Sequence, residues 1–263
     1  MQTSTSEQIR ATVRQAYGAI ATQKQQSGCC AGGPSCCGPT GASSRQLGYT
    51  DADLAAVPED ADLGLGCGNP QAIAGLTHGE RVLDLGSGAG FDVFLAARQV
   101  GPTGRVIGVD MTPEMIERAR ANAAQIGAAH VDFRLGEIEQ LPVDDGSIDV
   151  IMSNCVINLA PDKPAVFREA FRVLAPGGRL AISDIVAIGD VPAAIAADPA
   201  AYTGCIAGAA PVAELERMIV DAGFTDVRIA VQAQSRGFIE EWSPGSGAEQ
   251  FVASALIEAV KPL

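Results

Sequence analysis

Cysteines are the residues of this chain whose side chains could do chemistry that other residue types cannot. Four of the seven form two adjacent pairs near the N-terminus, at 29–30 and 36–37, and three stand alone: Cys67, Cys155 and Cys205. Thiolates are soft ligands that also exchange disulfides, so the chain could bind a soft metal or metalloid, or act in redox chemistry. The three isolated cysteines lack the C-x-x-C spacing of a structural zinc ribbon. A lone cysteine is often only a small buried apolar residue, so the elements that position these three must be considered next.

A glycine-rich turn follows a short apolar run at residues 81–85. Glycines stand at positions 86, 88 and 90, and the segment Phe91–Arg98 then has the pattern of a helix. The order indicates a buried strand, a tight turn and a helix N-terminus, which is the opening unit of a doubly wound α/β sheet. A second apolar run, RVIGVD, ends at Asp110, roughly 20 residues further on, where such folds bind ribose hydroxyls. We therefore predict a nucleoside site at this turn, against the alternative of a turn whose glycines are incidental.

Two side chains at the turn indicate which nucleoside it binds. Phe91 occupies the place where a dinucleotide fingerprint requires glycine or alanine. The carboxylate of Asp84 precedes the turn, where it would oppose a pyrophosphate but suit a cation such as the sulfonium of S-adenosylmethionine (SAM). The pattern resembles motif I and the acid that follows it in class I SAM-dependent methyltransferases, on five residues: Asp84, Gly86, Gly88, Gly90 and Asp110.

Composition limits the partners of the chain. Its 263 residues are 47% hydrophobic and 19% charged, which is typical of a globular protein. A formal charge of −13 argues against a nucleic-acid partner, because phosphate backbones require clustered lysine and arginine. The sequence contains no apolar run of about 18 residues, and its first ten residues are polar, so we expect no membrane span and a cytoplasmic location. An odd number of cysteines favours free thiols over a disulfide framework.

Apolar runs and helical spacing predict the elements around the turn. Expected strands lie at 81–85, 105–109, 131–135, 148–153, 179–185 and 225–231, with a last one near 251–260. Expected helices lie at 91–99, 113–126, 164–174 and 211–222, with small-residue pieces at 193–197 and 199–208. An amphipathic helix is expected over 7–26, and Thr50 with Asp53 can cap a short helix that runs through Val57. Cys155 then follows the fourth strand, at the sheet edge that carries the glycine turn.

Five segments of the chain resemble the As(III) SAM methyltransferases: LGLGCGNP, DLGSGAGFD, RVIGVDMTPEMIERAR, SNCVINL and YTGCIAG. The match runs from about Tyr17 to Phe224. The glycine turn alone would indicate only a methyltransferase, whereas the three cysteine-bearing segments are specific. The resemblance implies a Rossmann-like class I SAM-dependent methyltransferase fold, α/β, with a doubly wound sheet and a reversed final strand. It also implies an N-terminal helix and Cys-rich arm over residues 1–70 that covers the site, and a core over 71–263 with an arsenic-site insertion around 190–211.

The family resemblance assigns roles to the cysteines. It implies that the thiolates of Cys67, Cys155 and Cys205 hold trivalent arsenic, supplied as arsenite or methylarsenite, for methylation in arsenic detoxification. A fourth cysteine pairs with the equivalent of Cys67 during turnover, and Cys36 or Cys37 fits it best by proximity. A thiol reductant, thioredoxin or glutathione, would reset that pair. The arsenic lone pair carries no proton, so no general base is required, and catalysis would mainly be positioning. We expect a monomer without a metal cofactor.

The resemblance also implies the SAM contacts. Five residues would surround the methionine portion: Asp84, Gly86, Ser87, Gly88 and Gly90. Ser87 stands where many relatives carry cysteine. Asp110 would accept a hydrogen bond from the ribose and Met111 would pack on the adenine. Glu137 and Ile138 would meet the adenine edge, and Asn154 would line the pocket beside Cys155.

Two other functions compete with arsenic methylation. One is a carbon methyltransferase for a quinone or sterol-like substrate, because its core motifs are shared; it would leave the three isolated cysteines without a role. The other is a non-catalytic thiol protein that binds metalloids or senses redox state on a SAM-binding fold. The two N-terminal cysteine pairs are either part of a mobile tail or a capture site that passes arsenic inward.

Overall fold

A computed structural model describes residues 5–22, 44–242 and 245–263 of the protein. The N-terminal cysteine pairs, at 29–30 and 36–37, and the predicted last turn of the first helix lie outside these residues. Among the described residues, no helix is both long and apolar enough to cross a bilayer.

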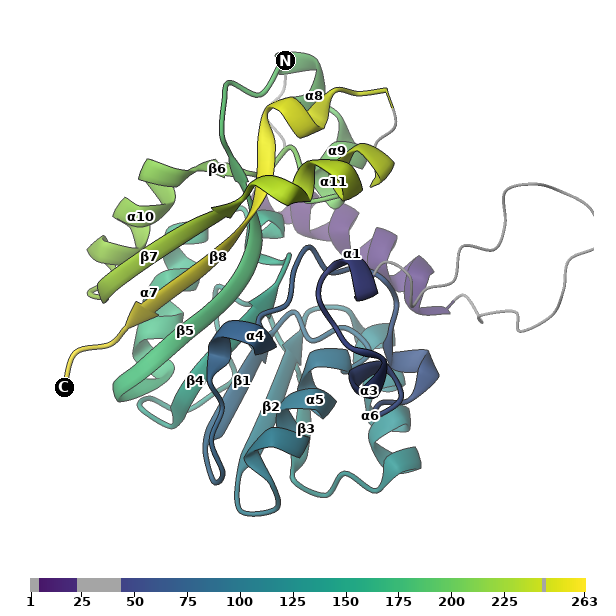
Figure 1. The fold of residues 1–263 in the computed structure, drawn as a ribbon, viewed down its shortest axis with the longest axis vertical. Helices are drawn as coiled ribbons and strands as arrows, with labels where there is room; N and C mark the ends of the chain where they lie inside the picture. Colours follow the sequence, from purple (N-terminus) through teal and green to yellow (C-terminus); the bar gives the residue numbers. More distant parts are fainter. Residues whose placement is uncertain (1–4, 23–43, 243–244) are drawn as a thin grey trace, which may run out of the picture.

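A single mixed sheet forms the centre of the described structure (Figure 1). Its strands run in the order β3-β2-β1-β4-β5-β8-β7, with the short β6 beside β5. The strands β1 to β5 pair in parallel, and β8 is antiparallel to both β5 and β7, which confirms the reversed final strand. The bounds are β1 Arg81–Leu85, β2 Arg105–Asp110, β3 Val131–Leu135, β4 Ile148–Asn154, β5 Leu174–Ala187, β6 Ala210–Pro211, β7 Thr225–Gln232 and β8 Val252–Val260.

Helices cover both faces of the sheet, as a doubly wound fold requires. One core joins apolar residues of β1, β2 and β4 to the helices α4 (Gln71–Ala74), α5 (Phe91–Val100) and α6 (Pro113–Ile126). The other core lies against α7 (Lys163–Val173) and α10 (Val212–Asp221). Because both faces are covered, the central strands are nearly continuous apolar runs, which is why their positions could be predicted.

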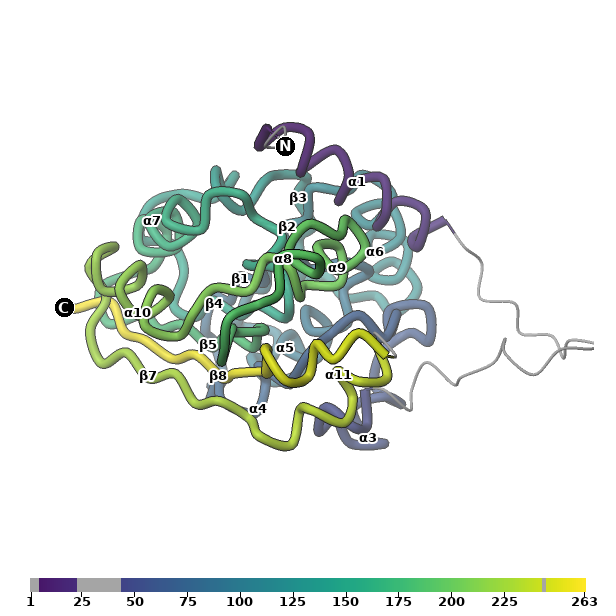
Figure 2. The backbone as a smooth tube through the Cα atoms, turned by 90° about the horizontal axis from the view of Figure 1, so that it is seen from above, coloured from purple at the N-terminus to yellow at the C-terminus, as the bar shows by residue number. Residues whose placement is uncertain are grey.

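Helix α1 and several short elements flank the sheet, most of them at the carboxyl edge of the parallel strands, where Figures 1 and 2 show α1, α8, α9 and α11. They are α1 (Ser6–Thr22), α3 (Asp51–Leu54), α8 (Ala193–Ala196), α9 (Pro199–Thr203), α11 (Arg236–Trp242) and four 3-10 turns: Glu59–Ala61, Ile157–Leu159, Ala233–Ser235 and Ala248–Gln250. Helix α1 packs against α6 and α9, and the hydroxyl of Tyr17 donates a hydrogen bond to the carbonyl of Thr203 at 3.1 Å. The first helix and the segment around 190–211, far apart in the sequence, are therefore neighbours at this edge.

The capping box at the third helix is present as predicted. The Thr50 side chain accepts from the amide of Asp53, and the Asp53 carboxylate accepts from the amide of Thr50. The helix ends at Leu54, however, three residues before the predicted Val57. Proline at position 58 disfavours helical backbone at Val57, which excludes that residue from the helix. The structure also contains α4, α11 and β6, which were not predicted.

Candidate active site

The glycine turn joins β1 to α5 in backbone conformations that favour glycine. Gly86, Gly88 and Gly90 have φ values of 68°, 50° and 97°, all in the left-handed region. A Cβ added to Gly86 would lie 2.3 Å from Cγ2 of Val156, so the turn packs directly on the segment that follows Cys155. A Cβ at Gly88 would meet nothing within 4 Å, because this residue faces open space. The turn therefore leaves a free main-chain surface at the carboxyl edge, where such sheets bind ligands.

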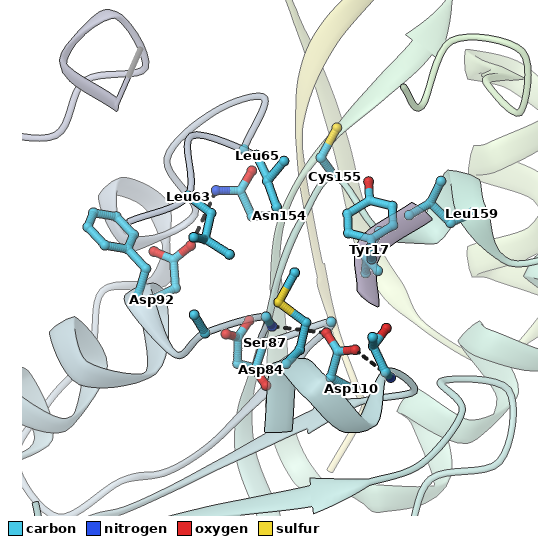
Figure 3. Close-up of a pocket in the computed structure, with 18 of the residues that line it drawn as sticks. Tyr17, Leu63, Leu65, Asp84, Ser87, Asp92, Asp110, Asn154, Cys155 and Leu159 are labelled. Carbon is cyan, nitrogen blue, oxygen red and sulfur yellow. Dashed lines mark hydrogen bonds between the residues drawn. The ribbon is translucent and has the colours of Figure 1, made fainter. Parts of the chain in front are cut away.

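A cleft with an empty volume of about 1120 Å³ opens over this turn (Figure 3). Eight of the predicted cofactor residues line it: Asp84, Gly86, Ser87, Gly88, Asp110, Met111, Ile138 and Asn154. Gly90 lies behind the turn, where an added Cβ would be 2.8 Å from the ring of Phe94. Glu137 does not line the cleft, because its carboxylate pairs with Arg10 at 3.1 Å and Arg14 at 3.5 Å on α1. The next acid along the chain, Glu139, lines the cleft instead.

Three acidic side chains lie together in the cleft, two of them buried and the third, Asp110, partly buried. Asp84, Asp92 and Asp110 all line it, and burial raises the pKa of each above its usual value. The charges of Asp92 and Asp110 raise the pKa of Asp84 further. Asp110 is held in place, because its carboxylate accepts from the amides of Gly88 at 3.0 Å and Thr112 at 2.8 Å. Ser87 presents a buried hydroxyl without a hydrogen-bond partner. A ligand that carries cationic groups would relieve the repulsion among these acids.

The three isolated cysteines meet in one cluster beside the cleft. Cys67 precedes the sheet, Cys155 follows β4 and Cys205 follows α9, yet all three are buried in the same apolar group. The Cys205 thiol donates to the carbonyl of Cys155 at 2.8 Å, and the Cys67 thiol lies 3.6 Å from the carbonyl of Ser183. None of the three forms a disulfide. The sulfur atoms of Cys67 and Cys155 lie within 4.8 Å of each other and of a carboxylate oxygen of Asp184.

The main chain is strained at two of these cysteines. Cys155 and Cys205 have φ values of 60° and 62°, and in the described part of the chain only one other non-glycine residue, Asp226, has a positive φ. Left-handed backbone at such residues costs about 1–2 kcal/mol and is kept where the surroundings hold it, commonly at functional sites.

Burial also keeps the thiols of Cys67 and Cys155 neutral. It raises the pKa of Cys67 to about 11, and burial together with the neighbouring thiols raises the pKa of Cys155 well above its usual range. These two thiols are protonated at neutral pH, so neither carries the charge of a free thiolate. Such a site suits a ligand that arrives with its own proton acceptors.

Asn154 connects the loop that carries Cys67 to the cofactor side of the cleft (Figure 3). Its side-chain oxygen accepts from the amide of Cys67 at 3.0 Å, and its nitrogen donates to the carbonyl of Gly68 at 2.9 Å. The same nitrogen lies 3.2 Å from the carboxylate of Asp92 and 3.1 Å from the hydroxyl of Tyr49. In Figure 3, Asp92 stands on one side of the cleft and Cys155 with Tyr17 on the other.

Sequence reasoning did not name four residues that the structure places at the site: Tyr17, Tyr49, Asp92 and Asp184. Asp92 had a readable signal, because it stands in the first turn of the helix that the glycines open. Asp184 also follows a pattern, since it lies on the strand beside the one that ends at Asn154. The two tyrosines had none, because each comes from an arm that reaches the cleft only in the folded chain.

The fold and this cleft define a class I SAM-dependent methyltransferase. A methyltransferase-domain profile matches residues 76–223. An arsenite methyltransferase of Halobacterium salinarum is 52% identical over 97% of this chain and 67% of its own length, and one of Aquipseudomonas alcaligenes is 44% identical over 65% of this chain and 51% of its own. The crystal structure of an arsenic(III) SAM methyltransferase from Chlamydomonas reinhardtii matches with a TM-score of 0.66 at 35% identity, over 81% of this chain and 73% of that one. The chain belongs to the arsenite methyltransferase family, and it spans about two thirds of the first of these relatives and half of the second.

Proposed function

We propose that the protein transfers methyl groups from SAM to trivalent arsenic bound by Cys67, Cys155 and Cys205. The observation that carries the proposal is the meeting of three buried thiols, from three separate segments, beside the cleft of the glycine turn. Relatives at 52% and 44% identity are arsenite methyltransferases, which supports the same substrate here. Methylation of carbon in a quinone or sterol-like substrate would give these thiols no reason to meet.

The neutral thiols suit arsenite, which enters as a neutral trihydroxide. Each exchange forms an As–S bond and breaks an As–O bond, and the thiol proton leaves with the hydroxide as water. Three exchanges release three waters and leave a pyramidal, uncharged centre with one lone pair. Trivalent arsenic is soft, so sulfur is its natural ligand. Burial of the three side chains excludes bulk water, which would otherwise reverse the exchange.

The residues around the glycine turn fit SAM. The buried acids suit its ammonium and sulfonium charges, Gly88 leaves space for close approach, and Ser87 has an unpaired hydroxyl. When bound, SAM supplies an electrophilic methyl group for the arsenic lone pair. We assign its methionine portion to Asp84 and the residues 86–90, its ribose to Asp110, and its adenine to Met111 and Ile138. The sequence resemblance adds Glu137 at the adenine edge, but its carboxylate pairs with α1 instead.

Further turnover requires a reductant. Methylation at a lone pair raises arsenic from the trivalent to the pentavalent state, so two electrons must return before the next round. Two thiols supply them when they join as a disulfide. The proposal assigns this pair to Cys67 with Cys36 or Cys37, and its reduction to thioredoxin or glutathione.

The remaining features of the proposal come from the sequence. Residues 1–70 form an arm that covers the site, and residues 71–263 form the methyltransferase core with its arsenic-site insertion around 190–211. The contacts of Arg10, Val13 and Tyr17 with the cleft support the first assignment. The enzyme would act as a cytoplasmic monomer in arsenic detoxification, without a metal cofactor.

A turnover assay tests the proposal. Purified protein is incubated with SAM, arsenite and a thiol reductant, and the arsenic products are separated and identified by mass. The parent should yield methylated arsenic and Cys155→Ser should yield none, while a Cys29→Ser, Cys30→Ser variant is the matched control and should remain active. If a parent protein that binds SAM yields no methylated arsenic, the proposal fails and a carbon substrate becomes the better candidate.

A further inference from the structure

A buried carboxylate beside the thiols has no part in the proposed chemistry. Asp184 lies on β5 with a relative exposure of 2%. One of its carboxylate oxygens is within 4.8 Å of the sulfurs of both Cys67 and Cys155. Burial of a carboxylate destabilises the fold unless hydrogen-bond donors surround it, so the presence of this one beside three thiols requires a reason.

The main chain around Cys155 satisfies this carboxylate. Oδ2 of Asp184 accepts from the amide of Ile157 at 2.8 Å, and Oδ1 accepts from the amide of Ile185 at 2.7 Å. A third donor, the side-chain nitrogen of Asn158, reaches Oδ1 at 2.9 Å. Ile157 and Asn158 belong to the 3-10 turn that directly follows Cys155. The carboxylate of Asp184 therefore holds in place the 3-10 turn that follows Cys155.

Asn158 extends the same contact to the third cysteine. Its side-chain nitrogen also donates to the carbonyl of Ile185 at 2.5 Å and lies 3.3 Å from the carbonyl of Cys205. The chain after Cys205 packs closely on this residue, because a Cβ added to Gly208 would lie 2.2 Å from the Asn158 carbonyl oxygen. One carboxylate thus contacts the backbone two residues after Cys155 directly, and the carbonyl of Cys205 through the side-chain amide of Asn158.

These contacts act where the chain is strained. Cys155 and Cys205 both have left-handed backbone, with φ of 60° and 62°. Such backbone relaxes unless neighbouring groups hold it. The amide of Cys155 also donates to the carbonyl of Ser183 at 2.8 Å, so β5 contacts this cysteine as well as the turn that follows it.

We propose that Asp184 is the positioning residue of the arsenic site, an inference that rests on the function proposed above. Through Ile157 and Asn158 it holds Cys155 and Cys205 in left-handed conformations. These place the sulfur of Cys155 beside that of Cys67 and the thiol of Cys205 against the carbonyl of Cys155. Three sulfurs at fixed mutual distances are what a pyramidal arsenic centre requires. Asparagine cannot replace this group, because two oxygens receive three donors and the amide nitrogen would face one of them.

The test is Asp184→Asn in the full chain, with Asp162→Asn as the matched control. Asp162 also loses its charge, but its exposed side chain caps α7, and asparagine caps equally well. In Asp184→Asn we expect the arsenite KM to rise about tenfold or more, with the affinity for S-adenosylhomocysteine within about twofold of the parent. X-ray absorption at the arsenic edge should count three sulfur ligands in the parent and in the control, and two in the variant.

A second variant covers the case in which Asp184→Asn does not fold. Asn158→Ala keeps the amide donors of Ile157 and Ile185 to Asp184. It removes the side-chain nitrogen that reaches Asp184, the carbonyl of Ile185 and the carbonyl of Cys205. It should also lose one sulfur ligand, with a smaller rise in arsenite KM. Three sulfur ligands and an unchanged arsenite KM in either folded variant would overturn the inference, as would an equal loss of arsenite and S-adenosylhomocysteine binding. If the parent itself fails to bind arsenic through three sulfurs, the proposed function fails instead.

Discussion

Gly68, directly after Cys67, lies against the sheet so closely that alanine would not fit. A Cβ at this position would lie 1.9 Å from Oγ of Ser183 and 3.0 Å from its Cβ. The backbone of Gly68 is not left-handed, so an alanine would be strained by this contact alone. The hydroxyl of Ser183 is buried and has no hydrogen-bond partner. Gly68→Ala should therefore shift the loop that carries Cys67 without changing any other side chain of the site.

The size of the effect follows from the distance. The added methyl and the hydroxyl must move apart by more than about 1 Å to reach ordinary contact, and overpacking of this kind costs about 1–3 kcal/mol. Ser183 belongs to an interior strand, whereas Cys67 stands in a loop, so the loop should be the part that moves. We expect the arsenite KM to rise about tenfold, which corresponds to about 1.4 kcal/mol, while the SAM KM stays within about twofold.

A compensating substitution makes the test specific. Ser183→Ala removes the clashing hydroxyl and leaves a tight contact of 3.0 Å, and the loss of an unpaired buried hydroxyl should not destabilise the fold. The double variant should therefore recover most of the arsenite affinity. Gly237→Ala on α11 is the control, because an added Cβ there meets nothing within 4 Å. The KM values of arsenite and SAM are obtained from initial rates for four proteins: the parent, Gly68→Ala, the double variant and Gly237→Ala. An unchanged arsenite KM in Gly68→Ala, or no recovery in the double variant, would refute the reasoning.

Three further outcomes follow from the geometry of the site. Because burial keeps Cys67 and Cys155 protonated, arsenite binding near pH 7 should exchange fewer than one proton per arsenic with the solvent. Calorimetry in buffers of different ionisation enthalpy measures this number, and uptake of two or more protons would mean that the thiols rest as thiolates. Asn154→Ala should raise the KM of both arsenite and SAM about tenfold in steady-state assays, since its amide contacts both sides of the cleft. Glu137→Gln should leave SAM affinity within about twofold, because that carboxylate pairs with α1; a large loss in a binding titration would restore its adenine role.

The sequence was informative about the sheet and the cofactor turn for one physical reason. Parallel strands buried on both faces leave near-continuous apolar runs, and a turn with positive φ leaves glycines, so both features are local. The same locality placed Cys155 at the end of β4. The edges of elements were less certain, as the early end of α3 before Pro58 shows, because the helix end depends on a neighbour rather than on the helix itself.

The arsenic site was only partly readable because its decisive features are not local. Nothing in the sequence around Cys155 or Cys205 signals left-handed backbone, since that conformation is imposed by contacts with β5 and with the 3-10 turn. In the sequence, Asp184 is one acid in an apolar strand. Its three hydrogen-bond donors come from residues 157, 158 and 185, and the first two are far from it along the chain. The family resemblance could name the cysteines, but only the folded chain shows what holds them.

The reversed strand β8 also has a part in that arrangement. It inserts beside β5, and the hydroxyl of Ser254 on β8 donates to the carbonyl of Cys67 at 2.8 Å. The carbonyl of Ser183 on β5 accepts from Cys67 and from Cys155, while Asp184 holds the turn after Cys155. Two neighbouring interior strands of the sheet, β5 and β8, thus contact the segments of the cysteine cluster. Since a central strand is among the last elements to open, the spacing of the thiols should persist as long as the sheet itself.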